Sequence, residues 1–276
     1  MATVIAVSSF VARGTVGLRA IMPALDRMGH EAIALPTILL SSHLGHAQAS
    51  GSAVAPQTLA AMIDALEANG WLAGAEAVLT GYLPSPDHVH VVQRLFARVR
   101  AARPQALVVC DPVLGDADGG LYVPRAVADE VAARLVPLAT HLKLNAFELA
   151  FLSGRPVESP ADAVAAAKAL GPPVVLATSV PVAADRLANV IVTADHAAQC
   201  TVAREAHVPH GTGDLVAAIF TAHTLDGEDP ATSAGFATGA VAAAIAVSRG
   251  ADELNLSGPS GWHEAPPLAM SEIDLG

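Results

Sequence analysis

Ala106-Leu-Val-Val-Cys-Asp-Pro-Val-Leu-Gly-Asp116 is the stretch that decides the fold class. Its unbroken run of Leu and Val is typical of a strand that is covered on both faces, as in a parallel sheet between helices. Pro112 disfavours a helical conformation for Asp111, so the strand ends on a carboxylate. We therefore expect an α/β protein with a central, mostly parallel sheet, and Asp111 at the carboxyl edge of that sheet.

The same pattern recurs on both sides of this stretch. Strand-like apolar runs alternate with helical patterns, and no linker composition interrupts them. The predicted strands are 3–7, 32–40, 77–83, 106–110, 141–144, 173–178, 189–193 and 199–208. The predicted helices are 18–28, 56–68, 89–101, 160–170, one beginning near 212, and 230–248. A single domain over residues 1–276 follows, with residues 258–276, rich in proline and acidic side chains, as a loosely ordered tail.

The composition argues against several classes of partner. The 276 residues carry a net charge of −11 without a basic cluster, which disfavours nucleic acid and anionic membranes. Residues 230–248 lack charges, but their Ala, Gly, Ser and Thr favour helix packing over a membrane span. Two cysteines form no metal-ligand pattern, and the N-terminal apolar run is too short for a signal peptide. We expect a cytoplasmic protein.

His207-Val-Pro-His-Gly-Thr-Gly-Asp-Leu-Val-Ala-Ala-Ile-Phe220 is the second informative stretch. It joins a β-like run to a small-residue helix through a glycine-rich turn, and the free N–H groups of such a helix start favour an anion. Asp214 at this turn has two interpretations. It caps the helix, or it takes a proton from an alcohol while the turn holds a phosphoryl group.

Other polar residues follow the predicted strands. Ser8 and Ser9 are substrate contacts or turn residues, and Tyr82 stacks on a flat ligand or fills the core. Asp111 suits Mg²⁺ or its waters. Asn145 and Glu148 form a capping box or hold metal-bound water. The long polar loop 41–51 is predicted to be a lid or binding loop.

Together these segments resemble pyridoxal kinases, within the ribokinase-like superfamily of small-molecule kinases. The matching blocks occur in family order over most of the chain. They are Ser8-Ser9-Phe10-Val11, Gly14-Thr15-Val16-Gly17, Leu40-Ser41-Ser42-His43, Thr80-Gly81-Tyr82-Leu83, Cys110 to Asp116 with Leu121-Tyr122-Val123-Pro124, Asn145-Ala146-Phe147-Glu148, and His210 to Leu215. The resemblance implies a three-layer αβα fold, a homodimer, and ATP-dependent phosphorylation of the 5′-hydroxyl of pyridoxal in vitamin B6 salvage.

The resemblance also implies roles for individual positions. Asp214 matches the catalytic base, and Gly211, Thr212 and Gly213 match the turn that stabilises the phosphoryl group. The substrate positions are Ser9, Thr37, His43, Leu44 and Tyr82. The ATP positions are Asp111, Tyr122, Asn145, Glu148 and Thr178, of which Asp111 and Glu148 also serve Mg²⁺. K⁺ is a candidate monovalent cation.

The sequence departs from the family pattern at four places. Leu44 stands where Thr is common, Leu18 and Ser42 replace Asn, and Lys143-Leu144 replaces Thr-Pro. Lys143 either neutralises ATP or points to solvent, and solvent is the favoured interpretation. These changes affect the identification of the substrate more than they affect the assignment of phosphoryl transfer as the reaction. A hydroxymethylpyrimidine kinase and a non-catalytic vitamin- or nucleotide-binding protein on the same fold are the alternatives.

Overall fold

The computed structural model describes residues 1–257 and 261–275. Its strands are β1 Thr3–Val11, β2 Glu31–Leu40, β3 Gly51–Ala53, β4 Ala77–Thr80, β5 Leu107–Cys110, β6 Gly115–Asp116, β7 Gly120–Leu121, β8 His141–Asn145, β9 Val174–Ala183, β10 Arg186–Thr193, β11 Ala197–Ala203 and β12 Ser271–Glu272. Its α-helices are α1 Leu18–Arg27, α2 Pro56–Ala68, α3 Trp71–Gly74, α4 Pro86–Ala102, α5 Arg125–Arg134, α6 Ala146–Ser153, α7 Pro160–Leu170, α8 Thr212–Leu225 and α9 Pro230–Val247. Two 3-10 helices are η1 Val136–Leu138 and η2 Trp262–Glu264.

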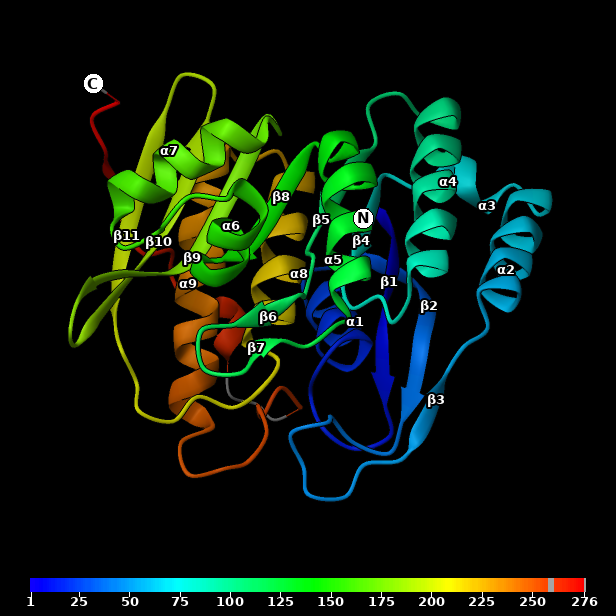
Figure 1. Ribbon diagram of the computed structural model, residues 1–276, viewed down its shortest axis with the longest axis horizontal. Coiled ribbons are helices and arrows are strands. Elements are labelled where there is room, and N and C mark those ends of the chain that lie inside the picture. Colours follow the sequence, from blue (N-terminus) through cyan, green and yellow to red (C-terminus); the bar gives the residue numbers. More distant parts are fainter. Residues whose placement is uncertain (258–260, 276) are drawn as a thin grey trace.

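One large sheet forms the middle layer of the molecule (Figure 1). Its strand order is β12-β11-β10-β9-β8-β5-β4-β1-β2-β3. Adjacent strands from β2 to β9 are parallel. Antiparallel strands extend the sheet at both edges, with β3 on one side and β10, β11 and β12 on the other. β6 and β7 form a separate small hairpin.

Helices cover both faces of this sheet, as the apolar strand at 106–110 predicts. Alternate residues of β1 point to opposite sides, so Ile5 and Val7 join one buried cluster while Val4 and Ala6 join the other. The first cluster packs against α2 to α7, and the second packs against α1, α8 and α9 (Figure 1). The three-layer αβα fold with a mostly parallel sheet is confirmed.

Several element boundaries differ from the sequence prediction. α2 and α7 have the predicted bounds, but β1 continues to Val11, because Phe10 and Val11 pair with Leu39 and Leu40 of β2. Ser8 and Ser9 therefore lie in a strand and not in a loop. β11 ends at Ala203, which pairs with Arg186, the first residue of β10. Because the partner strand starts there, residues 204–208 form a loop, and no strand leads directly into α8.

The C-terminal segment also differs from expectation. The predicted tail was 258–276, of which residues 258–260 and 276 lie outside the described residues. The described part is not loose, because Trp262 is 1% exposed and β12 pairs with β11. The segment lies against α9, where a Cβ on Gly239 would come within 2.3 Å of the Pro266 carbonyl oxygen. Small residues on α9 thus permit close packing.

α9 has the length and apolar composition of a membrane-crossing helix, and half of the matching window is buried inside the molecule. Its buried residues include Gly235, Gly239 and Ala244. Gly235 accepts a hydrogen bond from the N–H of Leu268 through its carbonyl oxygen, at 3.0 Å. The packing of α9 is therefore that of a core helix, as its small residues predict.

We predict that Trp262→Ala lowers the free energy of unfolding by about 3–5 kcal/mol, the usual cost of emptying a buried aromatic site. Its indole N–H also donates to the Leu256 carbonyl oxygen at 3.3 Å. Urea unfolding measures the change. Trp71→Ala is the matched control, because Trp71 is 55% exposed and its loss should cost well under 1 kcal/mol. A loss in Trp262→Ala as small as that in the control would show that the packing of Trp262 contributes little to stability.

Candidate functional site

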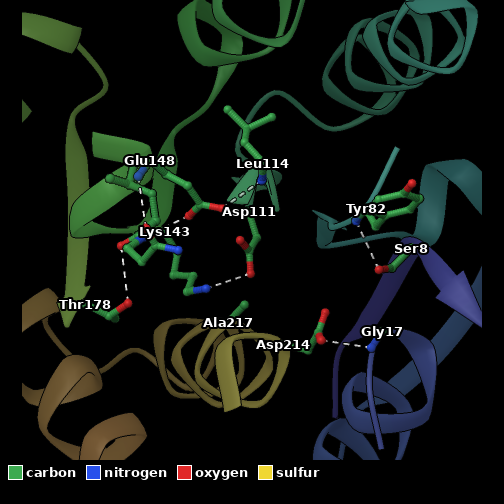
Figure 2. Close-up of polar contacts among 12 residues, drawn as sticks. Ser8, Gly17, Tyr82, Asp111, Leu114, Lys143, Glu148, Thr178, Asp214 and Ala217 are labelled. Atoms are coloured by element: carbon green, nitrogen blue, oxygen red, sulfur yellow. Dashed lines mark hydrogen bonds and ion pairs between the residues drawn. The ribbon is translucent and has the colours of Figure 1, made fainter. Parts of the chain in front are cut away.

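The carboxyl ends of five parallel strands meet along one edge of the sheet. β1, β4, β5, β8 and β9 all run in the same direction, so the residues at or just after their ends face a common region. Tyr82, Asp111 and Asn145 lie at or just after the ends of β4, β5 and β8, and Ser8, Ser9 and Thr178 lie beside them inside the longer strands β1 and β9. The N-terminus of α8 faces the same edge, as Figure 2 shows.

Asp214 occupies the first turn of α8 without capping it. Gly211 is the N-cap residue, and no side chain caps this helix. The Asp214 carboxylate instead accepts a hydrogen bond from the Gly17 N–H at 2.9 Å through Oδ2 (Figure 2). The helix-cap interpretation of Asp214 is therefore wrong, and its carboxylate is directed toward the start of α1.

Glycine is required where the turn before α8 meets the loop before α1. Gly211 has φ +95°, and a Cβ there would lie 1.8 Å from the Thr15 carbonyl oxygen. Gly17 has φ +55°, and its Cβ would lie 2.3 Å from Ser9 Oγ. Both positions combine a left-handed conformation with a backbone approach that excludes any side chain.

Burial and charge prepare Asp214 to accept a proton. Burial, reinforced by the negative charge of Asp111, raises the pKa of Asp214 to about 6, although the Gly17 hydrogen bond and Lys143 act in the opposite direction. Gly81 lies close by, since a Cβ there would be 3.7 Å from Asp214 Oδ1. A base with a pKa near 6 is ionised at neutral pH yet far more basic than an ordinary aspartate.

Ser8 and Thr37 support the segment that carries Tyr82. Ser8 Oγ accepts the Tyr82 N–H at 3.2 Å, and the buried Thr37 hydroxyl donates to the Tyr82 carbonyl oxygen at 2.7 Å. Tyr82 itself is partly buried, and burial raises the pKa of its phenol. Opposite Ser9, β2 contains one extra residue, because Ser8 pairs with Pro36 but Phe10 pairs with Leu39. Thr37 thus positions Tyr82, and no contact of its own hydroxyl with a substrate is needed to explain it.

His43 and Leu44 lie apart from these strand ends, on the loop between β2 and β3. Leu44 is 65% exposed, so in this conformation it contacts little of the protein. The His43 side chain is largely buried beside His46, His210 and Glu253. The substrate positions predicted from the sequence therefore form two groups, one at the strand ends and one on the loop.

Lys143 and Asp111 form a buried ion pair between β8 and the end of β5. The two residues are 4% and 2% exposed, and Nζ lies 3.0 Å from Asp111 Oδ2 (Figure 2). The expectation that Lys143 points to solvent is wrong. Burial lowers the pKa of Lys143, but the charges of Asp111 and Glu148 outweigh it and raise the pKa, so the side chain stays an ammonium.

The ammonium group of Lys143 also reaches the turn before α8. A Cβ on Gly213 would lie 2.9 Å from Nζ, so glycine leaves room for the lysine there. Asp111 Oδ1 is buried and accepts no hydrogen bond from the described residues. Burial raises the pKa of Asp111, against the effect of Lys143. The site thus combines a fixed cation with one carboxylate oxygen that is free for a further partner.

Asn145 and Glu148 form the predicted capping box at the start of α6. Asn145 Oδ1 accepts the Glu148 N–H at 2.9 Å, and Glu148 Oε2 accepts the Asn145 N–H at 2.9 Å. Glu148 has a second contact, because its Oε1 accepts the Leu114 N–H at 2.8 Å. Burial raises the pKa of Glu148 to about 7 despite the nearby Lys143. Both carboxylate oxygens are engaged, so Glu148 holds the segment after β5 in place.

That segment is strained. Val113 has φ 45°, which is rare for a β-branched residue and costs on the order of 1–3 kcal/mol. The Glu148–Leu114 hydrogen bond is next to it in the chain. With this conformation at Val113, the chain turns sharply after Asp111 and enters the β6–β7 hairpin beside the site.

Tyr122 and Thr178 complete the predicted ATP positions. Tyr122 is 47% exposed after the hairpin, and its hydroxyl donates to Asp116. Asn145 Nδ2 donates to the Gly115 carbonyl oxygen at 2.8 Å, which ties the hairpin to α6. Thr178 Oγ1 donates to the Leu144 carbonyl oxygen at 3.4 Å (Figure 2). The β6–β7 hairpin is therefore held beside the site by these hydrogen bonds.

Sequence reasoning assigned no separate role to Gly17 and Gly81, and for Lys143 it favoured solvent over the phosphates. Lys143 gave one signal, since it stands inside the apolar strand His141-Leu-Lys-Leu-Asn145. A lysine in a strand that is covered on both faces needs a buried carboxylate. The whole arrangement offers a base, a free helix N-terminus and a fixed cation within one region, which suits transfer of a phosphoryl group to an alcohol.

Comparisons with known proteins agree with this geometry. Residues 13–258 match the family model described as phosphomethylpyrimidine kinase. The chain is 38% identical over 230 residues to the pyridoxal kinase PdxY of Deinococcus radiodurans, covering 79% of this chain and 77% of the relative. It is 36% identical over 263 residues to the pyridoxine/pyridoxal/pyridoxamine kinase of Bordetella avium, covering 93% and 89%. The structure of the pyridoxal kinase of Leishmania donovani in complex with ADP and pyridoxamine superposes with a TM-score of 0.93 at 26% identity, covering 99% of this chain and 100% of that one.

We predict that Lys143→Met lowers the free energy of unfolding by about 3–5 kcal/mol, because it leaves Asp111 buried without its counter-charge. The double variant Lys143→Met/Asp111→Asn should recover most of this loss, since it removes the charge as well. Urea unfolding of both variants and of wild type measures the difference. A double variant as unstable as Lys143→Met would show that the two groups are not coupled.

Proposed function

This chain belongs to the phosphomethylpyrimidine kinase family and, within it, to the pyridoxal kinases, and we propose that it transfers the γ-phosphoryl group of MgATP to the 5′-hydroxyl of pyridoxal. The product is pyridoxal 5′-phosphate, so the reaction belongs to vitamin B6 salvage. The single observation that carries the proposal is the position of the Asp214 carboxylate. Asp214 lies in the first turn of α8, its carboxylate accepts a hydrogen bond from the Gly17 N–H, and its pKa is raised to about 6.

Asp214 acts as the general base. Its carboxylate takes the proton from the 5′-hydroxyl while the hydroxyl oxygen forms a bond to the γ-phosphorus, and the bond from that phosphorus to the β,γ-bridging oxygen breaks to release ADP. The N–H groups of the turn formed by Gly211, Thr212 and Gly213 face the developing negative charge. Because Gly213 lies against the Lys143 ammonium, Lys143 adds a fixed positive charge on the same side.

The residues on the nucleotide side fit a magnesium ion. Carboxylate oxygens are the ligands that Mg²⁺ prefers, and Asp111 Oδ1 is buried with no partner among the described residues. Glu148 stands behind this position and takes part through Asn145 and Leu114, with both oxygens engaged. Magnesium would supply charge neutralisation to the phosphates at this edge of the site. Thr178, Asn145 and Tyr122 border the same side, and Tyr122 lies on the hairpin that would cover the nucleotide.

The substrate side is assigned from the family resemblance and the geometry together. Ser9 lies beside Gly17 and Tyr82 beside Ser8, so both border the space next to Asp214. Thr37 acts through Tyr82, while His43 and Leu44 lie on the loop between β2 and β3, so their role as substrate positions rests on the resemblance. The homodimer and a role for K⁺ are supported by the resemblance alone, and the cytoplasmic location is supported by the sequence composition alone.

A hydroxymethylpyrimidine kinase is the second candidate. It is favoured by the description of the family model and by the substrate loop, in which Leu44 stands where Thr is common. Pyridoxal and hydroxymethylpyrimidine each present a hydroxymethyl group on a flat heterocycle, so Asp214 could serve either alcohol. A non-catalytic binding protein would not need a base at Asp214.

We expect ADP release with pyridoxal to exceed that with pyridoxine, pyridoxamine and hydroxymethylpyrimidine, measured on the purified protein with MgATP. The panel tests the substrate directly, because every compound in it carries a hydroxymethyl group that the same base could deprotonate. Faster turnover of hydroxymethylpyrimidine would transfer the assignment to the second candidate. Binding of pyridoxal without turnover of any of the four would support the binding protein.

We predict that Asp214→Asn lowers kcat by about 10²–10⁴-fold while ADP affinity is retained, since the amide keeps the size of the side chain but accepts no proton. Turnover and calorimetric ADP binding measure the two effects. Asp226→Asn is the matched control, because Asp226 lies at the other end of α8 and is half exposed. Near-normal turnover of Asp214→Asn would remove Asp214 from the role of base.

The pH profile provides a second readout for the same residue. Because the pKa of Asp214 is about 6 and the base acts only when ionised, kcat/KM should fall as the pH drops through about 6, and stay level above it. This fall of kcat/KM at low pH should disappear in Asp214→Asn. If kcat/KM of this variant still falls at low pH, the fall is due to another carboxyl group, such as that of Glu148, whose pKa is about 7.

A further inference from the structure

Glu253 lies in the segment after α9 and has no role in the proposed reaction, yet it contacts three parts of the kinase site. Its carboxylate binds the loop before α1 and the loop between β2 and β3, residues 41–50. Its backbone pairs with that of His210, the residue before the turn that leads into α8. The blocks of sequence that carry the family resemblance do not include Glu253, so only the folded chain shows these contacts.

The first contact is with the loop before α1. Glu253 Oε2 accepts the Thr15 N–H at 3.0 Å, and the Thr15 hydroxyl donates to the Leu254 carbonyl oxygen at 2.9 Å. Gly14 has φ +112°, and a Cβ there would lie 2.7 Å from Glu253 Oε1. The carboxylate therefore packs directly against the backbone of this loop, at a point where a side chain would displace it.

This loop carries the donor that orients the proposed base. Gly17 follows Thr15 by two residues, and its N–H donates to Asp214 Oδ2 at 2.9 Å. The carbonyl oxygen of Thr15 is also the atom that Gly211 approaches before α8. Thr15 is therefore held between Glu253 and the turn before α8. Loss of the Glu253 contact would leave the Gly17 N–H less precisely directed at Asp214.

The second contact is with the loop of residues 41–50. A carboxylate only accepts hydrogen bonds, so His46 Nε2 is the donor to Glu253 Oε1, at 3.0 Å. His43 Nδ1 accepts the Gly45 N–H, so the neutral ring carries its proton on Nε2, which lies 3.5 Å from Glu253 Oε1. Two imidazole N–H groups therefore lie near one oxygen of Glu253, while the Thr15 N–H occupies the other.

Glu253 is ionised in this setting. Burial opposes ionisation, but the hydrogen bonds from His46 and Thr15 outweigh it and lower the pKa of Glu253. Its side chain is 17% exposed, so water screens these contacts only in part. Hydrogen bonds to a charged acceptor are roughly twice as strong as those between neutral groups. One carboxylate can therefore fasten two loops that lie far from it in the sequence.

We propose that Glu253 is a positioning residue of the kinase site. Its carboxylate fixes the loop before α1 so that the Gly17 N–H meets Asp214, and it fastens the loop of residues 41–50 next to the loop before α1. It acts on the base through Thr15 and Gly17, and on the second loop through His46. Its effect on turnover rests on the proposed function, whereas its effect on the two loops and on the Asp214 carboxylate does not.

The first test is hydrogen exchange of the full-length protein, measured by mass spectrometry without substrate. Glu253→Ala should speed exchange about 10-fold or more in peptides from residues 12–18 and 41–50, since each loop loses a hydrogen bond to a charged group. His46→Ala should speed exchange in residues 41–50 alone, because Thr15 keeps its acceptor. Circular dichroism verifies that both variants are folded.

Glu130→Ala is the matched control for this test. Glu130 also accepts a hydrogen bond from a histidine, His90 Nε2 at 2.9 Å, but this pair joins α5 to α4. The control should leave exchange in both loops as it is in wild type. Unchanged exchange in Glu253→Ala, or the same increase in the control, would overturn the proposal.

The second test distinguishes positioning from a purely structural role. The Gly17 hydrogen bond lowers the pKa of Asp214, so Glu253→Ala should raise that pKa above about 6, with an increase in proton affinity of about tenfold. NMR titration of the Asp214 carboxyl carbon measures this pKa, and Asp214→Asn identifies the signal. His46→Ala should leave the pKa unchanged. An unchanged Asp214 pKa in Glu253→Ala would overturn the positioning role, even if exchange in the loops were faster.

Neither measurement uses turnover, so both results are independent of whether the chain phosphorylates pyridoxal. If Asp214 is the base, the fall of kcat/KM at low pH should move to higher pH in Glu253→Ala, together with the Asp214 pKa. A shift of the carboxyl titration without a shift of the kinetic profile would count against Asp214 as the base, and not against the role of Glu253.

Discussion

The position of Asp214 depends on backbone segments that approach one another more closely than any side chain allows. Gly211 contacts the Thr15 carbonyl, Gly17 contacts Ser9, and Gly81 contacts Ser8, where a Cβ would lie between 1.8 and 2.3 Å from the nearest atom. These contacts bring the starts of α1 and α8 together over the ends of β1 and β4. The Gly17 N–H can then bind the Asp214 carboxylate, which points away from its own helix. The chemistry of the site therefore rests on packing that only glycine permits.

Charge balance is the second constraint on the site. Three carboxyl groups, those of Asp111, Glu148 and Asp214, influence one buried ammonium group, that of Lys143. Burial is the main reason that the carboxyl pKa values are raised, and for Glu148 and Asp214 the negative charge of Asp111 raises them further. Asp214 reaches about 6 and Glu148 about 7. The magnesium site that we propose would use this excess of negative charge and the one free carboxylate oxygen of Asp111.

The sequence predicted the elements of the site well where the signal was local. The apolar run before Asp111 fixed a buried strand, and Asn145 with Glu148 gave the capping box found at α6. Contacts between distant segments were not predictable in the same way. Lysine is rarely buried unless it is paired, and the partner of Lys143 lies on another strand, so solvent was the natural expectation. The end of β11 depended on where β10 begins, and the order of the C-terminal segment depended on small residues of α9.

The structure also changes what the departures from the family pattern imply. From the sequence, they put the substrate in more doubt than phosphoryl transfer. Leu18, however, is 1% exposed and packs in the core at the start of α1, and Leu44 is 65% exposed. Neither is placed where it must decide between two heterocycles. Lys143 is the departure that enters the site, where it binds Asp111 and reaches the turn at Gly213. A fixed cation at that point adds to the attraction for phosphate oxygens, so the main change in this chain lies on the phosphoryl-transfer side of the reaction.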